Sequence, residues 1–188
     1  KSHRSISNRV AFQCKYLKPD DVVLQKCAIG FVDSIVEIWA SIASGNKMVF
    51  VDTHTSADPY ELINILDEYS VSVLYSVPTM LKHIMDALDG NEDLLASLRL
   101  IISSGEMLSC GLSQRILSCD SKIELLNIYG LTEAADVTFH NEQLLDLETR
   151  PHLGEAIEGN SIHCFDNEMN ILCVGADGEL CVSGAPLA

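Results

Sequence analysis

A group of polar side chains and a glycine occurs within one short stretch in the second half of the chain. Its members are Asn127, Tyr129, Gly130, Thr132 and Glu133, directly after a polar and apolar alternation that predicts a buried strand. Ligands bind at the carboxyl ends of strands in open α/β sheets, because the loops there border a crevice. For a nucleotide, Tyr129 offers a flat face and Asn127 an amide, while Thr132 offers a hydroxyl for a phosphate oxygen. Glu133 offers a carboxylate for magnesium.

Taken one by one, these residues also fit an ordinary turn, with Asn and Gly for its geometry and Thr and Glu as a helix cap. Residues 127–138 as a whole, NIYGLTEAADVT, resemble the Asn-x-Tyr-Gly-Pro-Thr-Glu signature of the adenylate-forming superfamily. This superfamily includes the adenylation domains of nonribosomal peptide synthetases and the acyl-CoA synthetases. Leu131 stands where proline is usual, which reduces the rigidity of the turn but removes no ligand group.

Apolar periodicity predicts alternating strands and helices ahead of this stretch. The predicted strands cover residues 22–30, 47–51, 71–77, 98–103 and 122–126. The helix between the first two begins with a capping box of Ser34 and Glu37, and later helices begin at Asp58-Pro59 and at Pro78. The short connections imply an α/β fold, a layered and mainly parallel sheet flanked by helices, over residues 1–149. The resemblance places it in the large N-terminal subdomain of adenylate-forming enzymes.

The pattern changes after about residue 149. Predicted short strands at 161–166, 171–174 and 179–183 are separated by turn clusters, with no helix between them. This indicates a small antiparallel β unit over residues 150–188, which the resemblance makes the start of a β-barrel-like subdomain.

Residues 31–37, FVDSIVE, lie at a predicted strand-to-helix junction on the same edge of the sheet. They resemble the Phe-Asp-x-Ser-x-x-Glu segment of adenylation domains, in which the Asp binds the amino group of the substrate. Val32 stands where that Asp is usual, and Asp33 follows one residue later. The displacement resembles domains for β-alanine and other β-amino acids, whose ammonium lies one carbon further from the carboxylate. The alternative is that Asp33 and Ser34 only cap the helix.

The resemblance implies a substrate pocket built from several strand ends. Its residues are Val32, Asp33, Val36, Tyr75, Ile102, Ser104, Ile128, Asp136 and Val137. The apolar members would otherwise be ordinary core residues. Asp33 and Asp136 are different, because a buried carboxylate needs a partner and a substrate ammonium would supply one.

The same resemblance implies an ATP site and a reaction. Its cofactor-binding residues would be Gly105, Glu106, Asn127, Tyr129, Gly130 and Thr132. Thr132 and Glu133 would be catalytic, Thr132 at the α-phosphate and Glu133 as the magnesium ligand. The implied activity is ATP-dependent activation of an amino acid as an aminoacyl-adenylate, followed by transfer to a phosphopantetheine thiol on a carrier-protein domain. Catalysis of this kind is mainly positioning and neutralisation of charge.

Composition limits the partners. The chain has 188 residues, of which 47% are hydrophobic and 21% charged, as expected for a globular protein. Its formal net charge of −15 argues against nucleic acid or an anionic membrane as a partner, since phosphates must be met by Lys and Arg. A single ATP can still be held by backbone amides and a metal ion.

The seven cysteines show neither a C-x-x-C pair nor zinc-finger spacing, which predicts reduced, structural thiols in a cytoplasmic protein. No apolar run is long enough for a membrane span, and the first ten residues lack the apolar core of a signal peptide. Because the chain lacks an initiator Met and ends on an apolar strand, we expect a fragment truncated at both ends.

Two other functions remain open from sequence alone. An acyl-CoA synthetase fragment would share the ATP groups but would need no anion beside its substrate, so Asp33 and Asp136 count against it. A catalytically inactive α/β interaction module would keep only the fold. The family's lysine-containing phosphate loop, ribose-binding Asp and C-terminal lysine all lie outside the sequence, so we expect the isolated chain to be inactive.

Overall fold

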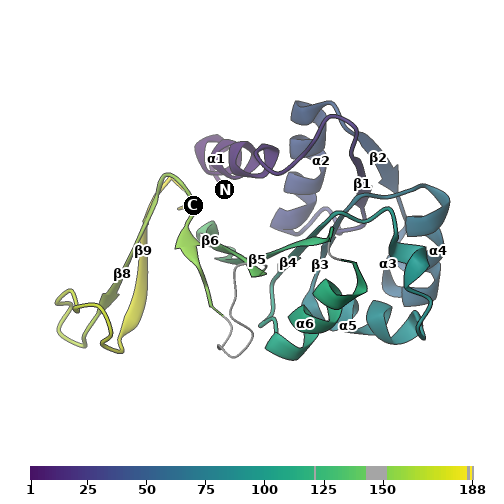
Figure 1. The fold of residues 1–188 in the computed structure, drawn as a ribbon. Coiled ribbons are helices and arrows are strands. Elements are labelled where there is room, and N and C mark those ends of the chain that lie inside the picture. Colours follow the sequence, from purple (N-terminus) through teal and green to yellow (C-terminus); the bar gives the residue numbers. More distant parts are fainter. Residues whose placement is uncertain (121, 143–151, 186, 188) are drawn as a thin grey trace.

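The computed structural model describes residues 1–120, 122–142, 152–185 and 187. Within them, a seven-stranded sheet has the order β2-β1-β3-β4-β5-β6-β7 (Figure 1). Its parallel strands are β1 (Val22–Gln25), β2 (Lys47–Phe50), β3 (Val73–Ser76), β4 (Leu100–Ser104) and β5 (Glu124–Leu131). Two antiparallel strands, β6 (Ala135–Asn141) and β7 (Glu155–Ala156), extend the sheet beyond β5. The predicted parallel α/β sheet is confirmed.

Helices cover both faces of this sheet (Figure 1). On one face lie α1 (His3–Cys14) and α2 (Val32–Ser44), and on the other lie α4 (Pro59–Glu68), α5 (Pro78–Ala87) and α6 (Cys110–Cys119). The short helix α3 (Thr53–Ala57) and the 3-10 helix η1 (Glu92–Leu95) lie in connections. In the part of the chain described, no helix combines the length and apolarity needed to cross a bilayer.

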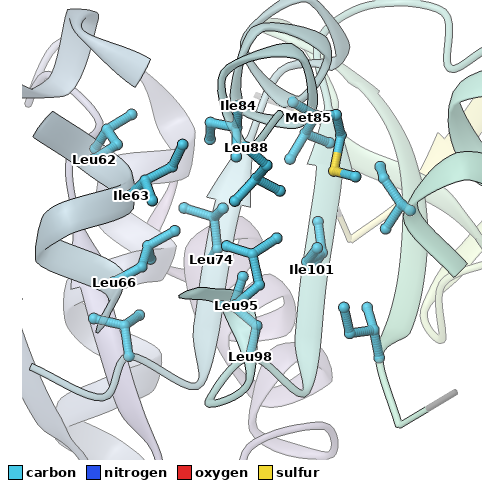
Figure 2. Packing of buried hydrophobic residues seen from close by; sticks show 14 of the residues in the cluster. Leu62, Ile63, Leu66, Leu74, Ile84, Met85, Leu88, Leu95, Leu98 and Ile101 are labelled. Atoms are coloured by element: carbon cyan, nitrogen blue, oxygen red, sulfur yellow. The ribbon is translucent and has the colours of Figure 1, made fainter. Parts of the chain in front are cut away.

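Successive strand residues serve opposite faces, as the two-residue period of a strand requires. Leu74 of β3 and Ile101 of β4 pack against the α4–α6 layer, whereas Val73 and Ile102 pack against α1 and α2. Figure 2 shows the first of these clusters, in which Leu62, Leu66 and Ile84 close around Leu74. Leu74 is completely buried.

The helix starts follow the sequence prediction at Asp58-Pro59 and at Pro78 and depart from it at the start of α2. Asp58 caps α4 by accepting a hydrogen bond from the Tyr60 N–H at 2.9 Å, with Pro59 at the first helical position, as predicted. The predicted capping box at the start of α2 is wrong. Ser34 Oγ instead donates to the Phe31 carbonyl at 2.7 Å, and the buried Glu37 carboxylate accepts from the Cys27 N–H at 3.0 Å.

The polar stretch at residues 127–133 lies in a hairpin rather than in a turn at the end of a strand. The strand predicted over residues 122–126, leading up to Asn127, is β5 and continues to Leu131, and β6 returns antiparallel to it. Ala135, the first residue of β6, follows the three-residue loop 132–134 and has φ 51°, in the left-handed region. Three-residue loops are among the commoner hairpin connections, and β6 stays paired with β5 across this one.

The C-terminal part forms a separate two-stranded antiparallel sheet, β8 (Asn160–Phe165) with β9 (Glu179–Gly184), which extends away from the large sheet (Figure 1). The predicted strand at 171–174 is wrong, because only Ile171 forms an isolated bridge, to Phe165. The predicted domain boundary at 149–150 falls within residues 143–151, outside the described part of the chain, and stays a prediction.

Candidate functional site

Two adjoining cavities lie at the carboxyl edge of the parallel strands. The larger, of about 540 Å³, is lined by Gly105, Glu106, Met107, Leu108, Asn127, Ile128, Tyr129, Gly130, His152 and Leu153. The smaller, of about 160 Å³, is lined by Phe31, Val32, Asp33, Ser104, Gly105, Gly130, Leu131, Thr132, Ala135 and Asp136. Gly105 and Gly130 border both cavities, so one ligand could occupy both.

At both shared glycines, Gly105 and Gly130, the backbone leaves no place for a side chain without strain or collision. Gly105 follows β4 with φ 81°, a conformation that side chains disfavour. At Gly130 a Cβ atom would collide with the Ala135 carbonyl and with Asp136, because β5 and β6 approach closely where their register shifts. Gly130 therefore permits the close approach of β5 and β6 in the hairpin.

The predicted nucleotide residues gather around the larger cavity. Asn127 and Tyr129 both line it, and Asn127 Nδ2 donates to the His152 carbonyl at 3.3 Å. The Glu106 carboxylate is already engaged, accepting from the Thr79 N–H at 2.9 Å and from Thr79 Oγ1 at 2.6 Å. Both bonds go to Glu106 Oε2, so this oxygen caps α5.

Thr132 lines the smaller cavity, whereas Glu133 lines neither cavity and is exposed in the hairpin loop. Burial lowers the pKa of Lys1 while the charges of Glu133 and Asp136 oppose this shift, so Lys1 is a neighbour of both carboxylates. The described residues contain no group of three or more His, Cys, Asp or Glu that could hold a metal ion. A single exposed carboxylate still fits magnesium, which keeps several waters and takes phosphate oxygens as further ligands.

Asp33 lies in the first turn of α2 and faces the smaller cavity. Its carboxylate accepts a hydrogen bond from Ser104 Oγ at 2.8 Å. Burial raises the pKa of Asp33, and the negative charge of Asp136 raises it further. Three elements, α2, β4 and β6, thus bring two carboxylates and a hydroxyl to one small cavity.

Asp136 has a cationic partner that the sequence did not reveal. Arg9 Nε on α1 donates to Asp136 Oδ2, and Arg9 Nη1 donates to Gln13 Oε1 at 2.9 Å. Both members of the pair are buried, with Arg9 2% and Asp136 7% exposed. A buried carboxylate predicts a nearby cation, but nothing in the sequence indicates which of the lysines and arginines supplies it.

The structure brings only part of the predicted substrate pocket to the smaller cavity. Val32, Asp33, Ser104 and Asp136 line it. The apolar and aromatic members Val36, Tyr75, Ile102 and Ile128 belong to the core cluster under α1 and α2, and Val137 is completely buried. Of these five, Ile128 also borders the larger cavity.

Comparison with known sequences places this geometry in context. The whole chain, residues 1–188, matches the model of a family described as AMP-binding enzyme. It is 33% identical over 188 residues to phosphinothricin tripeptide synthetase PhsB of Streptomyces viridochromogenes, covering 99% of this chain and 16% of that protein. It is 30% identical over 200 residues to the beta-alanyl-bioamine nonribosomal peptide synthetase ebony of Drosophila melanogaster, covering 99% of this chain and 23% of that protein.

Solved structures show the same fold. The AMPPNP-bound nonribosomal peptide synthetase FmoA3 superposes with a TM-score of 0.91 at 23% identity, over 100% of this chain and 21% of its own. Holo-PA1221, which contains adenylation and PCP domains, superposes with a TM-score of 0.81 at 25% identity, over 95% of this chain and 32% of its own. Against eight similar curated relatives, the chain spans between 3% and 27% of their length.

Proposed function

The chain belongs to the AMP-binding enzyme family, and from this premise we propose that it forms part of an ATP-dependent adenylation domain that activates an amino acid, namely β-alanine or another β-amino acid. In the proposed reaction the substrate carboxylate attacks the α-phosphate of ATP, pyrophosphate leaves, and an aminoacyl-adenylate forms. A phosphopantetheine thiol on a carrier domain then captures the aminoacyl group and releases AMP.

The observation that carries this proposal is the position of Asp33. Its carboxylate lies on the same 160 Å³ cavity as Thr132, beside the larger cavity that Tyr129 lines. Asp33 is half-buried, and a carboxylate partly withdrawn from water is stabilised by an opposite charge, which a substrate ammonium would provide. The name of the similar ebony protein, a beta-alanyl-bioamine synthetase, supports a β-amino acid as the ligand.

The larger cavity supports ATP as the second substrate. Its volume of about 540 Å³ suits an adenosine group, with Tyr129 as a flat surface for the base and Asn127 as a polar group beside it. Thr132 at the junction would hold the α-phosphate by its hydroxyl. When bound at Glu133, magnesium would neutralise phosphate charge, and the protein residues would contribute mainly by positioning the two substrates.

Further parts of the enzyme would complete the reaction. Among the described residues that line the two cavities there is no lysine or arginine, so little positive charge faces a triphosphate. We therefore propose that the isolated 188-residue chain does not complete the reaction. The similar PA1221 structure, which joins adenylation and PCP domains, supports a carrier domain as the partner in the full-length protein.

Pyrophosphate exchange by the full-length enzyme tests this proposal. β-Alanine, α-alanine and a fatty acid are compared as the acid that drives exchange of labelled pyrophosphate into ATP. We expect β-alanine to support the fastest exchange. Exchange with the fatty acid alone would contradict the role of Asp33 and favour an acyl-CoA synthetase.

Binding of ATP provides a second test of the same proposal. A ligand that binds only the folded state raises the midpoint of unfolding. We expect saturating ATP and magnesium to raise the unfolding temperature of the full-length protein. Unchanged unfolding together with absent exchange would favour an inactive interaction module.

A further inference from the structure

Arg9 is a buried cation directly behind the proposed substrate cavity. It lies on α1, packs 5.5 Å from the centre of the Phe12 ring, and donates to the Asp136 carboxylate. Arg9 does not itself line the 160 Å³ cavity, whereas Asp136 does. Arg9 Nη2 is buried and has no hydrogen-bond partner among the described residues. Among the described residues, Asp136 is the one carboxylate that forms an ion pair with Arg9.

The charged groups on the wall of the smaller cavity are both carboxylates. Asp33 and Asp136 are the two carboxylates that line it. Asp33 accepts a hydrogen bond from Ser104 and forms no ion pair with a described residue. Burial and the charge of Asp136 raise the pKa of Asp33, whereas the charges of Arg9 and Lys26 lower it. Lys26 in turn lies close to the buried Glu37, whose charge opposes the lowering of the Lys26 pKa by burial.

Two carboxylates at the cavity and one guanidinium behind them leave one negative charge without a paired cation. We infer that Arg9 is a positioning residue that sets which substrate charge the cavity accepts. By pairing with Asp136, Arg9 leaves Asp33 as the single carboxylate for the ligand. The cavity then accepts an amino acid with one ammonium group and discriminates against one with two. This inference rests on the proposed function. It adds to that function a residue that acts through Asp136 rather than by touching the substrate.

A purely structural ion pair is the competing explanation. Buried ion pairs are often no more stabilising than apolar residues of the same volume, so stability alone is a weak reason for this pair. The two explanations differ in what they predict for substrate charge. A structural pair would affect all substrates equally, whereas a charge-setting pair changes the preference between substrates that differ only in charge.

The experiment compares β-alanine with 2,3-diaminopropionate, which adds a second amine to the same carbon skeleton. Pyrophosphate exchange by the full-length enzyme gives kcat/KM for both at about pH 6, where both amines carry protons. We expect Arg9→Gln to raise the ratio of 2,3-diaminopropionate to β-alanine by about tenfold, because two carboxylates then face the ligand. Asp136→Asn, which leaves Arg9 unpaired, should lower the same ratio by about tenfold.

Two further variants separate charge from folding. Arg9→Lys places an ammonium beside Asp136, and where that ammonium stays protonated in its buried position the ratio should remain within about twofold of wild type. The double variant with Arg9→Gln and Asp136→Asn restores one negative charge, and its ratio should return to within about threefold of wild type. If Arg9→Gln does not fold, Asp136→Asn and the double variant still test the inference.

If the wild type exchanges with amino acids but the ratio of kcat/KM for 2,3-diaminopropionate to that for β-alanine is equal in wild type, Arg9→Gln and Asp136→Asn, the role of Arg9 is overturned. Failure of the wild type to exchange with any amino acid would instead overturn the proposed function, and the role of Arg9 with it. A ratio that moves in opposite directions in the two single variants and returns in the double variant would support the inference.

Discussion

The two faces of the sheet differ in what their helices bury. On one face, α4 and α5 bury only apolar residues, and α6 buries Ile116 and a single polar residue, Ser113. On the other face, α1 and α2 bury six polar or charged residues, namely Ser5, Arg9, Gln13, Ser34, Glu37 and Ser41. The candidate site adjoins this second face. Apolar burial on the first face stabilises the fold, and the second face holds charged groups in a fixed arrangement beneath the cavity.

The largest effect expected from this contrast is on the apolar face. Leu74→Ala removes a completely buried side chain and should lower the free energy of unfolding by roughly 2–5 kcal/mol, because it leaves a cavity between β3 and α4. Urea denaturation measures this change, with the exposed Ile42→Ala as the matched control. Where the variant is still folded, its kcat/KM should equal that of wild type. A loss of activity in the folded variant would show that packing on the apolar face also affects the candidate site.

Asp33→Asn should have the largest effect on activity. Removing one partner of a buried charge pair weakens the interaction strongly, so we expect kcat/KM for β-alanine to fall by about 100-fold or more. ATP-dependent stabilisation should remain, because Asp33 does not line the larger cavity. Asp20→Asn, at an exposed carboxylate, is the control. Equal loss in both variants, or no loss in Asp33→Asn, would contradict the role of Asp33.

Glu37 should make the stability of the polar face depend on pH. Burial raises the pKa of Glu37 from its ordinary 4.5 to about 7. The native state therefore binds more protons than the unfolded chain between these values, and the free energy of unfolding falls as the pH rises. From about pH 5 to pH 8 this group should remove roughly 2 kcal/mol of stability.

Urea denaturation at these two pH values measures the Glu37 effect, and Glu37→Gln should flatten the dependence. The control is Glu61→Gln, which changes an exposed carboxylate on the apolar face, in α4. An identical pH dependence in wild type and Glu37→Gln would show that the Glu37 carboxyl does not carry the linkage.

The smallest expected effect concerns Glu106. Because its carboxylate caps α5 through Thr79, Glu106→Ala should lower the free energy of unfolding by about 1 kcal/mol. Its backbone amide is retained, so the KM for ATP should stay within about twofold of wild type. A rise in that KM well beyond this, without a change in stability, would show that the side chain contacts the nucleotide.

The apolar face was also the part that the sequence predicted best. Periodicity found the buried sides of α4 and α5, and the capping residues Asp58 and Pro59 fixed where α4 begins. These are local patterns, so neighbouring residues contain the information. Helix α1 was not predicted, because its buried residues include Arg9 and Gln13 and its apolar pattern is correspondingly weak.

The candidate site could be predicted only in part, because its geometry depends on contacts between distant residues. Asp33 in the first turn of α2, Ser104 at the end of β4 and Thr132 in the loop after β5 do meet at one cavity. The pairing of Asp136 with Arg9 joins residues far apart in the sequence and left no local pattern. Glu37 matched a capping box in sequence, but the Cys27 N–H in the preceding loop bound its carboxylate instead.

The most direct test of the central claim is a crystal structure of the full-length enzyme with a non-hydrolysable β-alanyl-adenylate analogue. We predict that the ligand ammonium lies within about 3 Å of the Asp33 carboxylate and that the adenine packs against Tyr129. An ammonium bound elsewhere, with Asp33 bound only to Ser104, would contradict the account.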